Sequence, residues 1–478
     1  MRFASLFAAA TCALASTSSV WAAHSGSTRA LLRRDASTTF AFDSGATAKN
    51  TDGEDHGTPK VPNGAQLVTF PVGTKGHQAA VYWADSPKNA TAKQAFVMIH
   101  GRMKDGFDYW TTMNDILQSA LDADDSNADP NAIVVAPQFY SAKLNEGQYA
   151  DDVLAWGDVN AWQAGEAAVH PDGATESSFD TLDAFIDEFN DKSKYPAMQR
   201  LIFVGHGGGG QLLNRYAIVG KDAPAGIQIR YVAGDPSSSV YFTTDRPVTD
   251  DTVASKKDCP LYNTWRYGFD NFTGTLQGLK TPQDYFAQTI TRDVRYVVGY
   301  DDTASSGDQY CMAMLQGGEK RRDRNLSWWK YINTLARTAE DVSGLPGNFS
   351  NLPDWSAVSK NVISHHLTVI EGATHDAMEV FGSADGRSVL FDDANVPTGW
   401  RPAGWNPKGN GQKVAALSSS GASASGSSAP SGSHTSATKS GVSSSSSSSA
   451  AASSRSRVGV AGLVAPLVFI LASTVSLL

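Results

Sequence analysis

Cysteine is scarce in this sequence, with only 3 among 478 residues. Cys12 lies in an N-terminal segment that we expect to be removed, which leaves Cys259 and Cys311 in the mature chain. A cysteine-based metal site needs more Cys or His ligands nearby, and neither cysteine has them. We therefore expect no metal ion and no other cofactor. In an oxidising compartment, a lone pair of cysteines favours a disulfide over two free thiols.

Clustered positive charge is also lacking. The formal net charge is -9 at pH 7, whereas proteins that bind nucleic acid usually concentrate Lys and Arg on one face. We therefore expect no nucleic-acid partner. The one basic run, Lys320-Arg321-Arg322-Asp323-Arg324, is short and interrupted by an acid. We interpret it as the solvent-exposed face of a helix.

The N-terminus has the pattern of a secretion signal. Arg2 provides a positive start, residues 6–14 are mostly apolar, and small residues follow, which predicts a signal peptide over residues 1–22. Residues 23–57 are a candidate propeptide and loose segment. A secreted chain also explains the N-glycosylation sequons, which begin at Asn89, Asn271, Asn325 and Asn348.

The C-terminus predicts attachment to a membrane surface. Residues 412–449 are dominated by Ser, Ala, Gly and Thr, and they cannot bury enough apolar surface to fold. We expect them to form a disordered stalk. Residues 450–478 combine small residues, a polar spacer and an apolar tail, which is the pattern of a GPI-attachment signal. A terminal transmembrane helix is the alternative. The GPI interpretation predicts a protein on the outer face of the plasma membrane or in the cell wall.

Residues 58–411 have the pattern of one α/β domain. Two apolar-rich runs, 66–72 and 78–83, flank a Gly-containing turn and predict a hairpin. Strands are expected over 95–100, 132–137, 201–204, 228–233, 292–299 and 366–370, with helices over 108–123, 178–189 and 326–339. This alternation predicts a mostly parallel sheet with helices on both faces and the antiparallel hairpin at one edge.

The most informative absence is a serine. After the strand at 201–204, the sequence Gly205-His206-Gly207-Gly208-Gly209-Gly210-Gln211 leads into a helix. Strand, tight turn and helix make up the nucleophile elbow, G-x-S-x-G, of an α/β-hydrolase. Gly205 and Gly209 occupy the outer positions, and Gly207 stands where the serine belongs. Without that hydroxyl no covalent acyl intermediate can form, which predicts a pseudo-hydrolase that retains a ligand pocket.

An acid and a base follow two later strands. Asp301 and Asp302 follow the strand at 292–299 after Tyr300, and His375 follows the last strand. In this fold the nucleophile comes first along the chain, the acid second and the histidine last. We rank His206, His365 and His366 below His375, because they lie within the elbow or the last strand.

Half of an oxyanion hole is expected after the strand at 95–100. In hydrolases of this fold, a backbone N–H in that loop and the N–H after the nucleophile bind the developing oxyanion. Here these groups belong to Gly101 or Arg102, and to Gly208.

The chain resembles a fungal and bacterial branch of the α/β-hydrolases whose elbow reads G-H-S-A-G-G-Q. The similar segments include Asp235-Pro236-Ser237-Ser238, Gly299-Tyr300-Asp301-Asp302-Thr303 and Gly372-Ala373-Thr374-His375-Asp376. The resemblance implies that Asp302 is the acid and His375 the base. The departures from its pattern are Gly207 and Gly208.

Two other hypotheses remain open. The chain could be an active ester hydrolase that uses a His375-activated water or an unidentified nucleophile. It could also bind a dinucleotide, because Gly205-x-Gly207-x-x-Gly210 matches G-x-G-x-x-G and Asp235 follows the next strand as a candidate ribose ligand. The match lies well inside the chain rather than at the start of a βαβ unit, so we rank this reading lower. The expected ligand is a small ester-like or other small molecule.

Overall fold

The computed structural model describes residues 59–399 apart from 126, 158 and 159. The predicted signal peptide, N-terminal segment, stalk and GPI-attachment signal lie outside these residues, as does the end of the predicted domain. Across the described ranges, no helix combines the length and apolar character needed to cross a bilayer.

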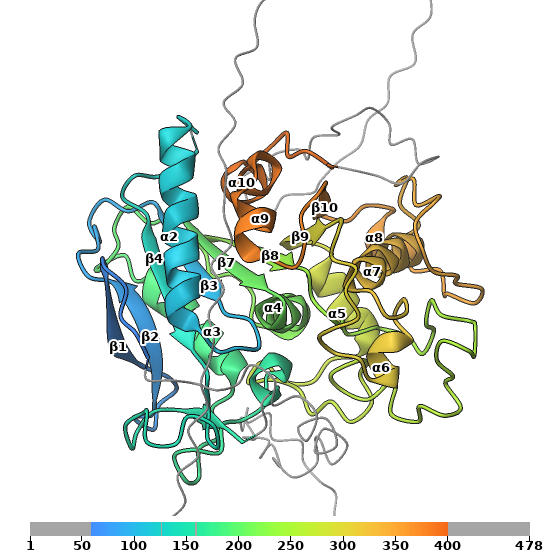
Figure 1. Ribbon diagram of the computed structural model, residues 1–478, viewed down its shortest axis with the longest axis horizontal. Coiled ribbons are helices and arrows are strands. Elements are labelled where there is room, and N and C mark those ends of the chain that lie inside the picture. The colour runs from blue at the N-terminus through green and yellow to red at the C-terminus, as the bar shows by residue number, and fades with distance from the viewer. Residues whose placement is uncertain (1–58, 126, 158–159, 400–478) are drawn as a thin grey trace, which may run out of the picture. The chain divides into compact units, whose positions relative to one another are not determined.

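An eight-stranded sheet runs through the centre of the fold, in the order β1-β2-β4-β3-β7-β8-β9-β10 (Figure 1). Its strands are β1 (Ala65–Pro71), β2 (Gln78–Ala84), β3 (Gln94–Ile99), β4 (Ile133–Gln138), β7 (Arg200–His206), β8 (Gln228–Gly234), β9 (Asp293–Gly299) and β10 (His365–Ile370). β2 pairs antiparallel with β1 and β4, and all other neighbours are parallel. The predicted hairpin and parallel sheet are confirmed. The sequence did not predict β5 (Tyr140–Ser141) and β6 (Ala155–Trp156), which form a separate two-stranded sheet.

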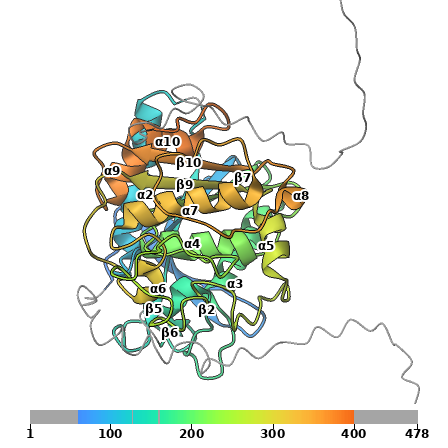
Figure 2. The same ribbon diagram turned by 90° about the vertical axis from the view of Figure 1, so that its right-hand side faces the viewer.

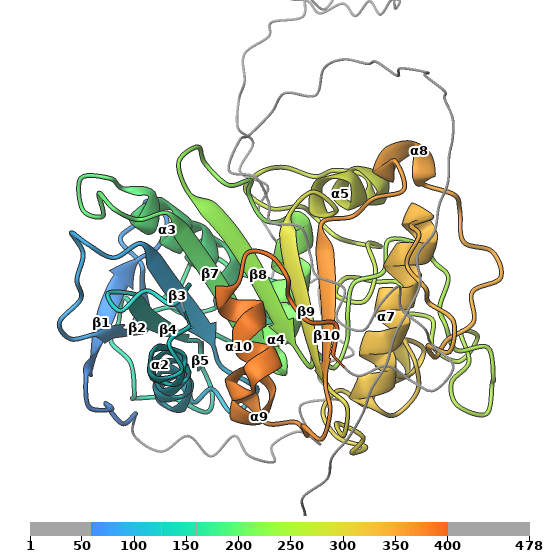
Figure 3. The same ribbon diagram turned by 90° about the horizontal axis from the view of Figure 1, so that it is seen from above.

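Helices cover both faces of the sheet, as predicted. One face packs against α3 (Ser178–Asn190), α4 (Gly208–Val219), α5 (Pro282–Thr289) and α7 (Arg321–Ala336) (Figure 2). The other packs against α2 (Gly106–Asp122), α9 (Ala377–Gly382) and α10 (Ala384–Phe391) (Figure 3). Shorter elements lie in the connections: η1 (Ala161–Ala164), α6 (Cys311–Met314) and α8 (Ser356–Ser359).

The helix α3 shows how the sequence produces these layers. Its large apolar residues recur every three or four positions and are buried against the sheet. Ser177 caps its first turn by accepting from the Asp180 N–H, and the Asp180 side chain accepts from the Ser177 N–H in return. Burial of one stripe and satisfaction of the first N–H groups together fix the start and the rotation of the helix.

The basic run at the start of α7 is not solvent-exposed as a whole, so that prediction is wrong. Arg321 and Arg324 are both 2% exposed. Arg324 donates to the backbone oxygens of Gly318 and Ser237, and Arg321 binds a carboxylate described below. A guanidinium can be buried when its donors are satisfied. The acceptors come from distant loops, which is why the local sequence gave no sign of them.

The four sequons differ in their accessibility. Asn271 and Asn348 are exposed, and Asn89 is half-buried. Asn325 is buried within α7, where its side-chain amide donates to the backbone oxygens of Pro236 and Arg321. A glycan on that nitrogen would remove both hydrogen bonds and has no room, so the structure excludes Asn325 from the predicted set.

A buried histidine in β10 makes the fold sensitive to acid. Burial lowers the pKa of His365 to about 4, although a hydrogen bond to the Thr289 carbonyl opposes that shift. The unfolded chain binds this proton near pH 6.5, so stability is complete above pH 6.5 and falls as the pH drops towards 4. We expect a loss of about 3 kcal/mol over that interval from this group.

Urea unfolding of the wild type and His365→Gln between pH 7 and pH 4 measures this loss. Glutamine can still donate to Thr289 but does not titrate, so the variant should show a flatter acid slope. Equal slopes in the two proteins would contradict the assignment.

Candidate functional site

The turn between β7 and α4 is built from glycines that leave no room for side chains. A β-carbon placed on Gly205 would lie 2.4 Å from the Gly209 carbonyl oxygen, and one on Gly209 would lie 2.4 Å from that of Ile99. One on Gly210 would lie 2.4 Å from the Gly234 carbonyl oxygen. A side chain at any of these positions would require the backbone itself to move. These glycines are therefore explained by the tight packing of strand, turn and helix.

Gly207 differs from its neighbours. It has φ 55° and ψ -108°, the strained conformation of a sharp turn from strand to helix. A β-carbon placed on it would meet only the imidazole of His375, 3.0 Å from Nε2 and 3.3 Å from Cε1. A side chain at position 207 would thus project towards His375, so the chain has the turn and the direction of a nucleophile without a nucleophilic group.

Asp302 and His375 lie together beside this position. His375 Nδ1 is 3.0 Å from Asp302 Oδ2. The Asp302 side chain is fully buried and accepts hydrogen bonds from two donors of Arg321, Nη2 at 2.7 Å and Nε at 2.9 Å. Burial raises the pKa of Asp302, but the hydrogen bonds from His375 and Arg321 outweigh it and lower that pKa. Asp301, the other candidate acid, is exposed.

The imidazole of His375 is held neutral. Although 32% of its side chain is exposed, the surrounding protein desolvates the ring and lowers its pKa to about 4; the neighbouring His206 lowers that pKa further, and Asp302 opposes the shift. Since Nδ1 faces the Asp302 carboxylate, Nδ1 carries the proton and Nε2 presents its lone pair towards Gly207. This is the tautomer that a general base requires.

The loop after β3 brings a second group of donors to the elbow. A β-carbon on Gly208 would lie 3.2 Å from the Arg102 backbone nitrogen, so the two N–H groups are close neighbours. Within the described part of the chain, neither N–H has a hydrogen-bond acceptor. His100 fixes the loop: it is fully buried, and its Nε2 accepts from the Phe139 N–H. The two N–H groups predicted to form an oxyanion hole therefore lie close together without an acceptor among the described residues.

Asp235 and His206 are buried next to the site and interact with other parts of the protein. Asp235 is fully buried, and its Oδ1 accepts from the Gly299 N–H. Its Oδ2 lies 3.6 Å from His206 Nε2. A carboxylate enclosed in this way cannot reach a ribose, which removes the residue on which the dinucleotide interpretation depended.

His206, Asp235 and His375 also approach one another closely enough to be considered as metal ligands, with one ligand atom from each within 4.8 Å of the others. However, the rings of His206 and His375 have centroids 4.3 Å apart and an interplanar angle of 36°. Two imidazoles that bind one zinc through in-plane nitrogens at about 2.0–2.1 Å place their centroids roughly 5 Å apart. The rings therefore pack against each other rather than converge on an ion.

A pocket adjoins the oxyanion donors. It encloses about 370 Å³ of empty space, part of it open to solvent, and it is lined by Arg102, Asn160, Gln163, Gln211, Arg266, Gly307, Asp308 and Tyr310. The pocket lies next to the elbow, because a β-carbon on Gly208 would lie 2.9 Å from the side-chain amide nitrogen of Gln163. Only Arg102 and Gln211 belong to segments that the sequence analysis singled out; the other members lie on connections without a motif.

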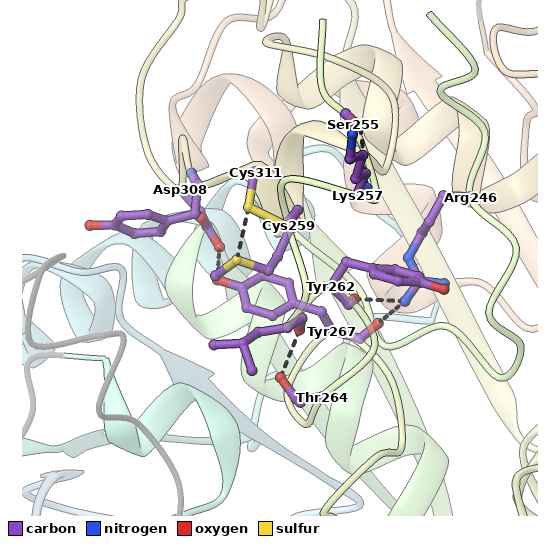
Figure 4. The surroundings of a disulfide bond; sticks show 12 residues. Arg246, Ser255, Lys257, Cys259, Tyr262, Thr264, Tyr267, Asp308 and Cys311 are labelled. Atoms are coloured by element: carbon purple, nitrogen blue, oxygen red, sulfur yellow. Dashed lines mark hydrogen bonds between the residues drawn. A yellow bond between two sulfur atoms is a disulfide. The ribbon is translucent and has the colours of Figure 1, made fainter. Parts of the chain in front are cut away.

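A disulfide joins two segments of the pocket wall. Cys259 and Cys311 are bonded, with 5.8 Å between their Cα atoms, which confirms the predicted pair. Arg266 lies on the segment after Cys259, and Asp308 lies just before Cys311. Figure 4 shows this region, where the Tyr267 hydroxyl donates to Asp308 Oδ2 at 2.7 Å.

The strand order, the antiparallel second strand and the elbow after β7 define an α/β-hydrolase fold. Its site holds an acid–histidine pair and two neighbouring N–H groups, with glycine at the position where this fold carries its nucleophile.

The sequence matches no protein-family model and no curated protein. Among solved structures, it is similar to LpqC, a poly(3-hydroxybutyrate) depolymerase from Bordetella parapertussis, with 18% identity, a TM-score of 0.45 and coverage of 72% of this chain and 95% of that one. Poly(aspartic acid) hydrolase-1 from Sphingomonas sp. KT-1 shows 17% identity, a TM-score of 0.43 and coverage of 66% and 95%. The siderophore hydrolase EstB from Aspergillus nidulans shows 13% identity, a TM-score of 0.34 and coverage of 71% and 98%.

Proposed function

We propose that this protein is a pseudo-hydrolase: an α/β-hydrolase scaffold that binds a small molecule at its former active site without turning it over. The observation that carries the proposal is the position of Gly207, where the absent side chain would project to within 3.0 Å of His375 Nε2. Asp302, His375 and the N–H groups of Arg102 and Gly208 are the groups that would serve an ester hydrolase. Without a hydroxyl at position 207 they cannot form an acyl-enzyme.

Secretion and surface anchoring belong to the same proposal. The Cys259–Cys311 disulfide and the exposed Asn271 and Asn348 sequons suit an oxidising, glycosylating compartment. A GPI anchor following a Ser-rich stalk would display the domain at the cell surface. Release of the protein from intact cells by a phosphatidylinositol-specific phospholipase tests this arrangement.

Hydrolysis of short p-nitrophenyl esters by the secreted chain tests the absence of turnover. The wild type and His375→Ala should release p-nitrophenol at the same background rate, because His375 has no hydroxyl to activate. Wild-type turnover that disappears in His375→Ala would overturn the proposal. It would instead support direct activation of a water by His375.

A further inference from the structure

One ring nitrogen of His375 is an acceptor without a donor among the residues that the structure describes. Its Nδ1 faces the Asp302 carboxylate at 3.0 Å. Hydrogen bonds from His375 and Arg321 lower the pKa of Asp302, so this carboxylate is ionised and can only accept. Since a neutral imidazole has one donor and one acceptor, Nδ1 is the donor and Nε2 the acceptor. Nε2 is thus open to a hydrogen bond from a ligand.

Glycine at position 207 explains why this acceptor is left over. In a nucleophile elbow, the serine hydroxyl donates its hydrogen bond to the histidine. A β-carbon on Gly207 would lie 3.0 Å from His375 Nε2, and it would meet no group other than this imidazole. No side chain at position 207 therefore fills the space in front of Nε2. Because 32% of the His375 side chain is exposed, a small solute can reach the ring.

Two donors without acceptors belong to the same turn. The N–H of Gly208 follows Gly207 directly in the chain, and the Arg102 nitrogen would lie 3.2 Å from a β-carbon on Gly208. Across the described ranges, neither N–H has an acceptor. Consecutive Cα atoms are about 3.8 Å apart, so one small group at the turn can face both the Nε2 acceptor and an N–H donor.

These unpaired groups indicate the chemistry of the ligand. A hydroxyl has one donor and two acceptor lone pairs, and a primary amide has N–H donors beside a carbonyl acceptor. Either group can donate to His375 Nε2 and accept from an N–H. An ester or an ether only accepts, and a carboxylate would bring its lone pairs and its charge against the lone pair of Nε2. The ring stays neutral at pH 7, because its pKa is lowered to about 4.

We infer that the ligand of this protein places a neutral hydroxyl or primary amide at the elbow, where it donates to His375 Nε2 in place of the missing serine hydroxyl. Gly207 then has a role beyond the loss of catalysis, because it leaves the acceptor to the ligand. This inference deepens the proposed function and rests on it for the idea that the ligand is bound and not consumed. Esters are accordingly not the preferred ligands.

NMR titration of the ¹⁵N-histidine-labelled secreted chain at pH 7 tests the inference at the atom concerned. The probes are two pairs, butyramide with N,N-dimethylbutyramide and butanol with methyl propyl ether. The second member of each pair keeps the acceptor and loses the donor. We expect a donor-bearing probe to shift His375 Nε2 and to bind about fivefold more tightly than its partner, which leaves Nε2 unpaired. His77 and His170, whose rings bind Glu176 and Val153, are the internal references and should not shift.

The outcomes of this titration separate the two kinds of donor. A preference in one pair alone supports the inference and identifies the hydroxyl or the amide as the recognised group. Equal affinities within both pairs would overturn it, as would the absence of a His375 shift with every probe. Tighter binding of sodium butyrate than of butyramide would also overturn it.

His375→Phe separates recognition from general disruption. Phenylalanine keeps a ring but has no acceptor, and Asp302 keeps its hydrogen bonds from Arg321. The fivefold preference should therefore disappear, whereas the affinity for N,N-dimethylbutyramide should change little. Gly207→Ala provides a second test, because its methyl group occupies the space in front of Nε2 and should abolish the preference. A preference that survives both changes would contradict the inference. Arg337→Gln, at an exposed arginine after α7, is the control and should keep the preference.

The failure of this inference can be distinguished from failure of the proposed function. A wild type that hydrolyses esters through His375 but binds the donor-bearing probes more tightly would overturn the pseudo-hydrolase proposal alone. An inert wild type that binds both members of each pair equally would overturn only the inference about the ligand.

Discussion

Gly207→Ser should give this protein strong esterase activity. The new hydroxyl would stand beside His375 Nε2, whose lone pair is free to accept its proton, and the acid and the oxyanion donors are already in place. Removing a triad member from a serine protease lowers turnover by about 10⁶. Because this site has not been refined around a serine, we expect a smaller recovery, at least about 10³-fold over the wild type with p-nitrophenyl acetate.

The matched control for this gain is Gly207→Ala. Alanine introduces the same β-carbon, with the same 3.0 Å contact to His375, but no hydroxyl. Both variants should lose about 1–3 kcal/mol of stability, because position 207 has a positive φ that side chains rarely adopt. Only the serine variant should turn over. Equal rates in the two variants, or an unchanged rate in Gly207→Ser/His375→Ala, would show that the gain does not come from a His-activated serine.

The low pKa of His375 predicts how the activity of the serine variant depends on pH. A general base acts when unprotonated, so activity depends on the fraction of His375 without a second proton. With a pKa lowered to about 4, kcat/KM should remain constant from pH 8 to about 5 and fall only below that. An acid limb near pH 6.5 would contradict this.

Arg321→Met should destabilise the fold by about 3–5 kcal/mol at pH 7, the usual cost of leaving a buried charge without its partner. Arg321 provides the hydrogen bonds at 2.7 and 2.9 Å to the fully buried Asp302 carboxylate. Chemical denaturation measures the loss. Arg322→Met is the control: its side chain is paired with Asp323 near the surface, and its removal should cost no more than about 1 kcal/mol.

The pH dependence of this loss identifies its cause. The pKa of Asp302 is lowered in the fold, so its contribution to stability is present above the unfolded value of about 3.9 and disappears as the pH falls through the folded value. The cost of Arg321→Met should therefore shrink in acid, and Asp302→Asn combined with Arg321→Met should recover part of it at pH 7. A loss independent of pH would indicate packing rather than charge.

The sheet and its helices could be predicted because their signals are local. The apolar runs that became β3 and β7, and the three-to-four periodicity that became α3, depend only on neighbouring residues. The elbow was also recognisable, since its glycines are adjacent in the chain. The position of residues after successive strands indicated Asp301 or Asp302 as the acid and His375 as the base, and the resemblance selected Asp302.

The pocket and the partner of Asp302 could not be predicted in this way. Arg321 is 19 residues from Asp302, and its sequence context is a charged helix start like many exposed ones. Arg266, Gln163 and Asp308 lie on connections where neither periodicity nor a motif fixes the direction of a side chain. Their proximity arises from tertiary packing, which brings together segments that are far apart in sequence.

The disulfide determines when the wall of the pocket is complete. Its two cysteines are 52 residues apart, and they join the segment that carries Arg266 to the one that carries Asp308. The sheet, the elbow and the His375–Asp302 pair do not depend on this bond for their connectivity. A newly made chain that has not yet met an oxidant would therefore have its hydrolase-like centre before it has a complete ligand wall. If the proposed binding role holds, the ligand would then be captured only once this bond has formed.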